Sequence, residues 1–395
     1  MNQYVIRIRY PFQYLSIYTY FISILILSIV DNTVTTAIFY IAALMCMFSW
    51  IRLNNRTNHN TQVIIVITMV CGIANIFLIG NLNYIRLLVL FLSFFVGKLF
   101  LNDSIEPKPF LNVFWIYTAF IVIRIFTQGL GQAVFTYVSN NYASVYLLCP
   151  LIIYYIKNER KQEKIDLIPA IVLWFICAFT TSRMGLLTAS FILGGLILYG
   201  AKKANGRFGP VIILIVIILF IIPLIPFVLP ILLSKYSDLY IIQRFMNIGL
   251  TSPARTRMWT EYFELLKNTK YLLFGAPTSE VYWAARFYEG NLHNSYLIVH
   301  AYLGILGFLG LVILIAKSYR FGVKKKNWVY LIMLTAFCVR SYTDHVFGCN
   351  RISPIIIFLI FLPFLPEYNT EFLFQKDQLE ISGKKKNNRG GLNHA

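Results

Sequence analysis

Four polar segments carry residues that could do chemistry in a chain that is otherwise mostly apolar. They are TTSRMG (180–185), RTR (255–257), NLHNSYLIVH (291–300) and RSYTDHVFGCNR (340–351). Their arginines offer planar guanidinium groups, which match phosphate oxygens and remain charged at any relevant pH. A neutral histidine can accept a proton from a hydroxyl group near neutral pH. Together these residue types indicate group transfer on an anionic substrate.

Each segment also has a simpler structural interpretation. Arg183 sits in a tight connection between two apolar runs, where arginines commonly snorkel to the membrane interface. Arg255 and Arg257 fit a solvated loop. Arg340 and Asp344 are four residues apart, so a helix-surface pair is the favoured interpretation for them. The functional interpretation therefore depends on the four segments occurring together.

Two histidines mark the start of one apolar run. His293 opens the run, and a polar residue at a helix start is unremarkable by itself. His300 lies seven residues later, on the same helix face and about two turns deeper. A polar residue at that depth faces protein or a water-filled cavity. We therefore expect His300 to support the structure, while His293 is the candidate for chemistry.

The composition indicates the class of protein. Of the 395 residues, 58% are hydrophobic and 13% are charged, whereas soluble domains carry about 25% charged residues. The mean hydropathy is +0.66, and long apolar runs recur along the whole chain. This pattern is typical of a polytopic membrane protein. The first apolar run has spanning length and lacks a cleavage site after it, so we expect it to be retained.

Several partner and cofactor classes are disfavoured. The net charge of +19 is spread over short loops, so nucleic acid is not an expected partner. The six cysteines lack CxxC spacing and mostly fall in apolar runs, which favours small buried residues over a disulfide or zinc framework. There is no ATP-binding glycine loop, no HExxH motif and no acidic metal cluster, so we expect neither a metal nor a cofactor.

Hydropathy predicts an all-α bundle of about twelve transmembrane helices of about 20 residues each, because unpaired backbone groups find no water in lipid. The expected spans are 13–30, 33–51, 62–80, 83–101, 110–127, 142–156, 166–182, 184–200, 209–233, 294–316, 327–347 and 352–366.

Lysine and arginine set the expected orientation. Basic residues gather in alternate connections and in the tail, so both termini are expected on the cytoplasmic side of the membrane. The chain then divides into a membrane bundle of about nine helices (1–233), a large extracytoplasmic loop between the ninth and tenth helices (234–293), the last helices (294–366) and a basic cytoplasmic tail (367–395).

The long loop has a helical pattern of its own. Within ARTRMWTEYFELLKN (254–268), apolar residues recur at helical spacing, which suits an amphipathic helix lying on the membrane or capping a cavity. Long structured loops usually carry function. All four polar segments fall on the expected outer side, which indicates a site for an anionic lipid-linked substrate and group transfer without a metal.

Three segments, in this order, resemble motifs of the O-antigen ligase and polymerase superfamily, the Wzy-type polysaccharide polymerases. TTSRMGLL is similar to the family's Ser-Arg-Gly-like segment, here with Met184 between Arg183 and Gly185. RTRMWTEYFELLKNTKYLLFGAP is similar to its Arg-x-x-x-Trp loop helix and turn, and LHNSYLIVHAYLGILGFLG to its His-Asn-x-x-Leu segment. The resemblance covers roughly residues 60–366, and the ordered trio carries it.

The resemblance implies a glycosyltransferase that joins oligosaccharide repeat units carried on undecaprenyl diphosphate at the outer leaflet. His293 would be the general base or would orient the acceptor hydroxyl, with Asn294 fixing the local geometry. Arg183, with one or both of Arg255 and Arg257, would hold the diphosphate and stabilise the charge of the leaving group. A single displacement would invert the anomeric centre.

Several points stay open at this stage. Arg286, Arg340 and Arg351 are further candidates for contact with the diphosphate or glycan. Membrane lipids, a flippase and a chain-length regulator are expected partners. The acceptor could instead be a lipid A core, which would make the protein an O-antigen ligase. A flippase or transporter of lipid-linked oligosaccharide, or a membrane sensor with the loop as a binding module, are the alternatives from other classes.

Overall fold

The computed structural model describes residues 11–53, 59–129, 134–180, 182–203 and 253–365, and the regular structure within these ranges is all helical. This confirms the predicted all-α class, and seven of the described helices are long and apolar enough to cross a membrane. They are α2 (Pro11–Ile29), α3 (Thr33–Arg52), α4 (His59–Leu78), α5 (Tyr84–Leu101), α6 (Lys108–Gln128), α9 (Arg183–Lys203) and α15 (Ser295–Lys324).

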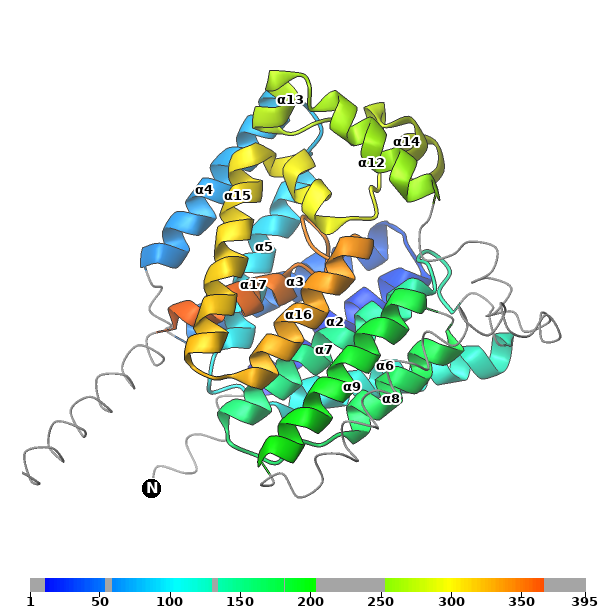
Figure 1. Cartoon of the computed structure of the whole chain (residues 1–395), viewed down its shortest axis with the longest axis vertical. Coiled ribbons are helices and arrows are strands. Elements are labelled where there is room, and N and C mark those ends of the chain that lie inside the picture. The colour runs from blue at the N-terminus through cyan, green and yellow to red at the C-terminus, as the bar shows by residue number, and fades with distance from the viewer. Residues whose placement is uncertain (1–10, 54–58, 130–133, 181, 204–252, 366–395) are drawn as a thin grey trace, which may run out of the picture.

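Four further helices complete the described part of the bundle (Figure 1). They are α7 (Asn141–Arg160), α8 (Ile168–Phe179), α16 (Trp328–Thr343) and α17 (Pro354–Phe361), which continues into the 3₁₀ turn η3 (Leu362–Phe364). α7 is buried along almost its whole length and packs against α6, α8, α9 and α16. It therefore lies inside the bundle and connects the earlier helices to α16.

Every predicted span within the described residues coincides with one of these helices. The largest difference is at α15, which continues beyond 316 to Lys324, so that Lys317, Arg320 and Lys324 lie in helical turns rather than in a loop. The predicted span 209–233, the loop residues 234–252 and the tail 367–395 lie outside the described residues. The total of about twelve helices therefore stays a prediction.

A group of short helices covers one end of the bundle (top of Figure 1). It comprises α12 (Pro253–Leu265), α13 (Thr269–Phe274), the 3₁₀ turn η2 (Thr278–Glu280) and α14 (Tyr282–Tyr288). α12 confirms the helix predicted within 254–268. It buries Met258 and Tyr262 completely and leaves Phe263 55% exposed, as expected of an amphipathic helix. This group places Arg255 over the end of the bundle.

α15 is interrupted at Gly304, whose φ of 65° and ψ of −170° are not helical. Gly304 packs against the backbone of α13, and a Cβ at this position would lie 2.1 Å from the carbonyl oxygen of Leu273. The interruption frees carbonyl groups of the preceding turn. The side-chain amides of Asn75 and Asn81 donate to the carbonyl of Ala301 at 3.0 and 2.9 Å, which satisfies a backbone group that lipid could not.

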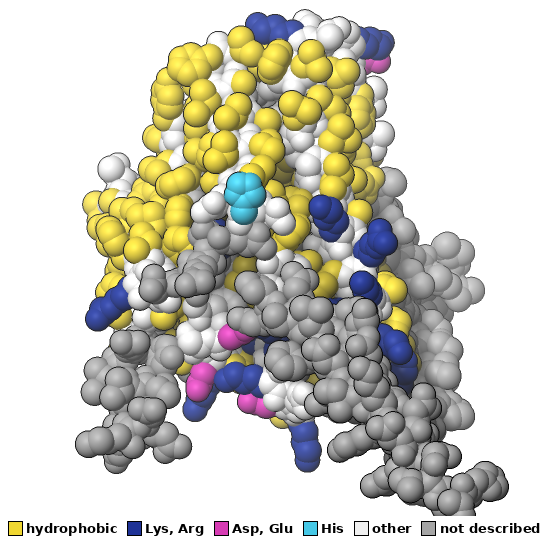
Figure 2. All heavy atoms as spheres, turned by 90° about the vertical axis from the view of Figure 1, so that its left-hand side faces the viewer, with side chains coloured by type: hydrophobic (Ala, Val, Ile, Leu, Met, Phe, Trp, Pro, Cys, Tyr) yellow, Lys and Arg dark blue, Asp and Glu magenta, His cyan; other side chains and the backbone are white. Residues whose placement is uncertain are grey.

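The outer face of the bundle matches a membrane environment. Figure 2 shows a broad apolar surface with Lys and Arg side chains above and below it. On α4, Val66, Val70 and Phe77 are 60%, 60% and 74% exposed. An exposed apolar surface of this extent indicates contact with lipid.

Candidate functional site

Asp344 is the centre of a charged network at the end of the bundle that carries α12–α14. It directly follows α16 and is buried. Its Oδ2 accepts a hydrogen bond from Nη1 of Arg340 at 2.5 Å, and its Oδ1 lies 3.3 Å from Nδ1 of His293 and 3.9 Å from Nη2 of Arg255. Three of the four polar segments therefore meet at one carboxylate.

Arg340 is fully committed to contacts inside the protein. Its side chain is 1% exposed, and it donates to Thr343 Oγ1 at 3.1 Å, to the carbonyl of Asn141 at 2.9 Å and to Ser144 Oγ at 3.3 Å. Arg340 and Asp344 form the predicted pair at the end of α16, but the pair is buried against α7 instead of lying on the helix surface. In the structure, Arg340 therefore holds Asp344 in place.

The fourth segment, 180–185, reaches the network through Ser144. The hydroxyl oxygens of Ser144 and Ser182 are 3.3 Å apart, and a Cβ on Gly185 would lie 2.5 Å from the Cβ of Ser144. The absence of a side chain at Gly185 therefore lets the start of α9 approach α7. Arg183 is the first residue of α9 and is half-buried, so it belongs to the same end of the bundle as the network.

Both the backbone and the ring of His293 are held in place. Its backbone N–H donates to Asn291 Oδ1 at 2.8 Å, and its φ of 49° lies in the left-handed region. The ring packs edge-on against Tyr288 with centroids 4.8 Å apart, and Nδ1 faces Asp344. The other ring nitrogen, Nε2, is buried and has no hydrogen-bond partner among the described residues. Strained non-glycine backbone of this kind concentrates at functional sites.

The electrostatics of the network keep the Asp344 carboxyl ionised. Burial by itself would raise the pKa of the Asp344 carboxyl, but Arg340, His293 and Arg255 outweigh burial and lower this pKa to about 2. Asp344 is therefore ionised at neutral pH and can only accept hydrogen bonds. A neutral imidazole that donates from Nδ1 to this carboxylate leaves Nε2 as an acceptor.

The loop after Asp344 adds a histidine that burial keeps neutral. Burial lowers the pKa of His345 to about 4, and its Nε2 donates to the carbonyl of Gly348 at 2.9 Å. In the unfolded chain this histidine binds a proton below about pH 6.5. Between about pH 6.5 and 4 the unfolded state therefore binds more protons, and stability falls as the pH falls.

We accordingly expect the midpoint of thermal unfolding in detergent to decrease from pH 7.5 to 4.5. Asp344 causes a further loss of stability only below about pH 4, where its carboxyl starts to bind a proton in the unfolded chain. A His345→Gln variant, which retains a donor for Gly348, should show a smaller decrease over this interval. A decrease of the same size in both proteins would contradict this assignment.

Two predicted arginines lie outside the network. The guanidinium of Arg257 is exposed and lies 5.1 Å from the ring centroid of Trp283. Arg286 is exposed on α14, where it donates to the hydroxyl of Tyr282 and lies over the ring of Phe287. The structure brings neither Arg257 nor Arg286 to Asp344. Of the two arginines in the segment 255–257, only Arg255 joins the charged network.

Two other predicted residues have identifiable structural contacts. Nη2 of Arg351 lies 3.7 Å from Oδ1 of Asp31, and its guanidinium lies over the ring of Phe39. The side chain of Asn294 accepts from two backbone N–H groups in the first turn of α15 and caps that helix. Asn294 therefore fixes the backbone directly after His293. Arg351 connects the loop before α17 to the loop before α3.

His300 connects three elements beneath the network. Its Nδ1 lies 2.7 Å from the hydroxyl of Tyr262 on α12, and its Nε2 lies 3.0 Å from the carbonyl of Leu272 on α13. Both ring nitrogens are thus engaged by the segments that cover the bundle. These contacts correspond to a supporting role for His300 on α15.

Two residues that the structure brings to this region were not selected from the sequence. Ser144, near the start of the apolar stretch 142–156, joins Arg340 to Ser182. Arg86 on α5 donates to the hydroxyl of Tyr302 and is close enough to His345 to oppose its protonation. The one available signal for Arg86 was an arginine in the first turn of an apolar span, where such residues are costly unless they have a role.

The arrangement can orient a histidine as a base beside a partly exposed arginine. Among the described residues, no group of three or more His, Cys, Asp or Glu side chains could hold a metal ion. None of the protein-family models, curated proteins or solved structures compared with this chain matches it.

Proposed function

We propose that this protein is a membrane glycosyltransferase that polymerises oligosaccharide repeat units carried on undecaprenyl diphosphate, at the outer leaflet of the bacterial inner membrane. The observation that carries the proposal is the pair of His293 and Asp344. Nδ1 of His293 lies 3.3 Å from the ionised carboxylate, and Nε2 is left without a partner among the described residues. This is the geometry of a general base held by an orienting carboxylate.

The proposed reaction is a single displacement. A hydroxyl oxygen of the acceptor sugar attacks the anomeric carbon of the donor, and the bond between that carbon and the diphosphate oxygen breaks. The hydroxyl proton moves to Nε2 of His293, and Asp344 stabilises the imidazolium that forms. Undecaprenyl diphosphate leaves with the electron pair of the broken bond. The configuration at the anomeric carbon is inverted.

The proposed cations for the leaving group are Arg255 and Arg183. The side chain of Arg255 is 25% exposed and lies 3.9 Å from Asp344, so one edge of its guanidinium remains available to a ligand. Arg183 begins α9 next to Ser182, which belongs to the same chain of hydrogen bonds. A guanidinium in this position stabilises the negative charge that develops on the diphosphate as the bond breaks.

The choice between polymerase and ligase concerns the acceptor. Both would use the same base and the same donor diphosphate, so the assay must offer both acceptors. We expect purified protein to extend a lipid-linked repeat unit into polymer without added nucleotide or divalent metal. Transfer to lipid A core alone would assign the protein to the ligases instead. Lipid movement between leaflets with no new glycosidic bond would overturn the enzyme proposal.

The site is tested by His293→Ala and Arg183→Ala in this assay. Each substitution should lower the rate of polymer formation by roughly 100-fold or more, which is the typical contribution of a general base or of one charge-stabilising group. Arg320→Ala, which removes an exposed arginine at the opposite end of α15, is the control and should retain the rate. If both site variants kept the full rate at normal protein levels, this assignment would be wrong.

A further inference from the structure

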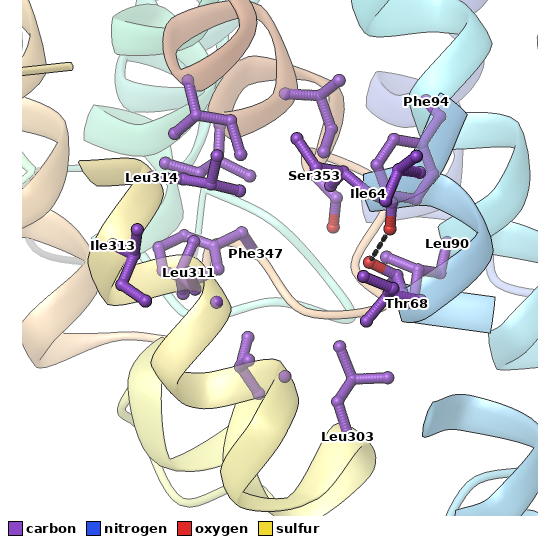
Figure 3. Close-up of a pocket in the computed structure, with 18 of the residues that line it drawn as sticks. Ile64, Thr68, Leu90, Phe94, Leu303, Leu311, Ile313, Leu314, Phe347 and Ser353 are labelled. Atoms are coloured by element: carbon purple, nitrogen blue, oxygen red, sulfur yellow. Dashed lines mark hydrogen bonds between the residues drawn. The ribbon is translucent and has the colours of Figure 1, made fainter. Parts of the chain in front are cut away.

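An apolar cavity of about 480 Å³ lies between α4, α5, α15 and α17. Figure 3 shows side chains of α4 and α5, such as Ile64 and Leu90, facing Leu311 and Leu314 of α15 across a common space. Most of its lining is aliphatic or aromatic, and its polar members are His59, Asn60, Thr68, Lys317 and Ser353. This volume falls within the range of small-molecule sites in proteins, about 300–1,000 Å³.

The cavity is accessible from the membrane. Several residues that line it also belong to the exposed apolar surface, including Ile67 on α4 and Leu306 and Ile313 on α15, which are 51%, 66% and 55% exposed. The cavity therefore borders the lipid-facing surface of α4 and α15. This favours a hydrocarbon chain of a membrane component over a water-soluble ligand.

One part of the cavity lies near Arg86, whose charge also acts on His345, the residue after Asp344. The cavity is lined there by Leu90, Leu303 and Gly348. Arg86 lies one helical turn before Leu90 and donates to the hydroxyl of Tyr302. Burial raises the pKa of the Cys349 thiol, and the positive charge of Arg86 acts to lower it.

No carboxylate among the described residues forms an ion pair with Arg86. Its guanidinium also lies 5.3 Å from the centroid of the Tyr302 ring, which fixes its position. An arginine offers five N–H donors in a planar fork, and the Tyr302 hydroxyl is its one acceptor given by the described part of the chain. It therefore has capacity to bind the oxygens of a phosphate.

We propose that the cavity holds the isoprenoid chain of the lipid-linked substrate and that Arg86 binds the phosphate nearest to that chain. The proposal rests on the proposed function and identifies how the same site selects its substrate. The lipid enters between α4 and α15, its first isoprene units occupy the cavity, and its diphosphate lies between Arg86 and the Asp344 network. The volume of about 480 Å³ is enough for a few isoprene units of one chain, not for the whole lipid.

Gly310 provides a direct test of the cavity. It lines the cavity, and a Cβ at this position would meet no heavy atom within 4 Å. Gly310→Leu should therefore fill the cavity and leave the helix intact. Gly200→Leu is the matched control, because Gly200 is also a helical glycine with open space around it but lies on α9.

Binding of undecaprenyl diphosphate to the detergent-solubilised full chain is the measurement. Gly310→Leu should weaken binding roughly tenfold or more, because it excludes methylene and methyl groups of the chain from the cavity. Gly200→Leu should bind as the wild type does. Unchanged binding by Gly310→Leu would overturn the cavity assignment.

Arg86→Gln tests the phosphate contact separately. It should weaken binding of undecaprenyl diphosphate by roughly tenfold or more, as expected for the loss of a charge-assisted hydrogen bond. Binding of the uncharged undecaprenol should not change. An equal effect on both lipids would overturn the role of Arg86, and so would a loss of this size in the Arg320→Gln control.

Competition identifies the source of the phosphate. Inorganic pyrophosphate and phosphatidylglycerol should each compete poorly with undecaprenyl diphosphate. Effective competition by pyrophosphate would overturn the role of the chain, and effective competition by phosphatidylglycerol would overturn the selection of a single isoprenoid chain.

The same measurements distinguish this proposal from the proposed function. They are repeated in a His293→Ala background, where binding should persist although no polymer forms. Loss of lipid binding in Gly310→Leu while wild-type protein makes no polymer would support the cavity and reject the polymerase. Normal lipid binding and normal polymer formation in Gly310→Leu would reject the cavity and leave the polymerase in place.

Discussion

Replacement of Asp344 by alanine is expected to remove both the stability of the site and the reaction. Asp344 accepts from Arg340 at 2.5 Å, and the arginine side chain is 1% exposed. Without the carboxylate, the guanidinium charge is buried and uncompensated, which typically destabilises a protein by about 3–5 kcal/mol. The ring of His293 also loses the acceptor that orients Nδ1. We expect a large decrease in the midpoint of thermal unfolding and no detectable polymer.

A matched control for this variant is Asp103→Ala. Asp103 pairs with Arg160, but its side chain is 45% exposed, and exposed ion pairs contribute about 0–1 kcal/mol. The control should therefore change the unfolding midpoint little. Equal decreases for the two alanine variants would contradict the central place of Asp344.

A double variant separates the structural role of Asp344 from its role in the reaction. Arg340→Met combined with Asp344→Leu replaces the buried pair with apolar side chains of similar size, and such exchanges are often neutral for stability. We expect this variant to recover much of the stability that Asp344→Ala loses. It should still form no polymer, because His293 lacks its orienting carboxylate. Recovery of polymer formation would show that Asp344 acts through stability alone.

Replacement of Gly304 by alanine is expected to disrupt the fold of α15. The φ and ψ of Gly304 belong to a region that only glycine occupies readily. The added Cβ would lie 2.1 Å from the carbonyl oxygen of Leu273, and a backbone carbonyl cannot move aside as a side-chain end can. Backbone strain and overpacking together should destabilise the protein by about 3 kcal/mol or more. Fluorescence-detected size exclusion would show loss of the folded peak.

The control for this prediction lies two turns further along the same helix. Gly310→Ala introduces a Cβ that meets no heavy atom within 4 Å. A glycine inside a helix is destabilising by roughly 0.5–1 kcal/mol relative to alanine, so this variant should be as stable as the wild type or slightly more stable. If Gly304→Ala folded as well as Gly310→Ala, the interruption of α15 would not be essential.

The sequence alone determined most of the helices. Every predicted span in the described residues is a helix, and so is the pattern within 254–268, because these features depend on local hydropathy and on the backbone's need for internal hydrogen bonds in lipid. The polar segments pointed to His293 and Arg255, and the structure brings both to one carboxylate. The polar segments and the resemblance also pointed to Arg257, Arg286 and Arg351, which make contacts elsewhere.

Only the tertiary structure decided which polar groups meet. Asp344 looked like half of a local helix pair, yet it joins residues from α12, α16 and the turn before α15. A buried polar group in a membrane bundle needs a partner, and the sequence shows that need. The identity of the partner depends on how helices far apart in sequence pack, and periodicity along one helix does not contain that information. The interruption of α15 at Gly304 and the cavity beside Arg86 were unpredicted for the same reason.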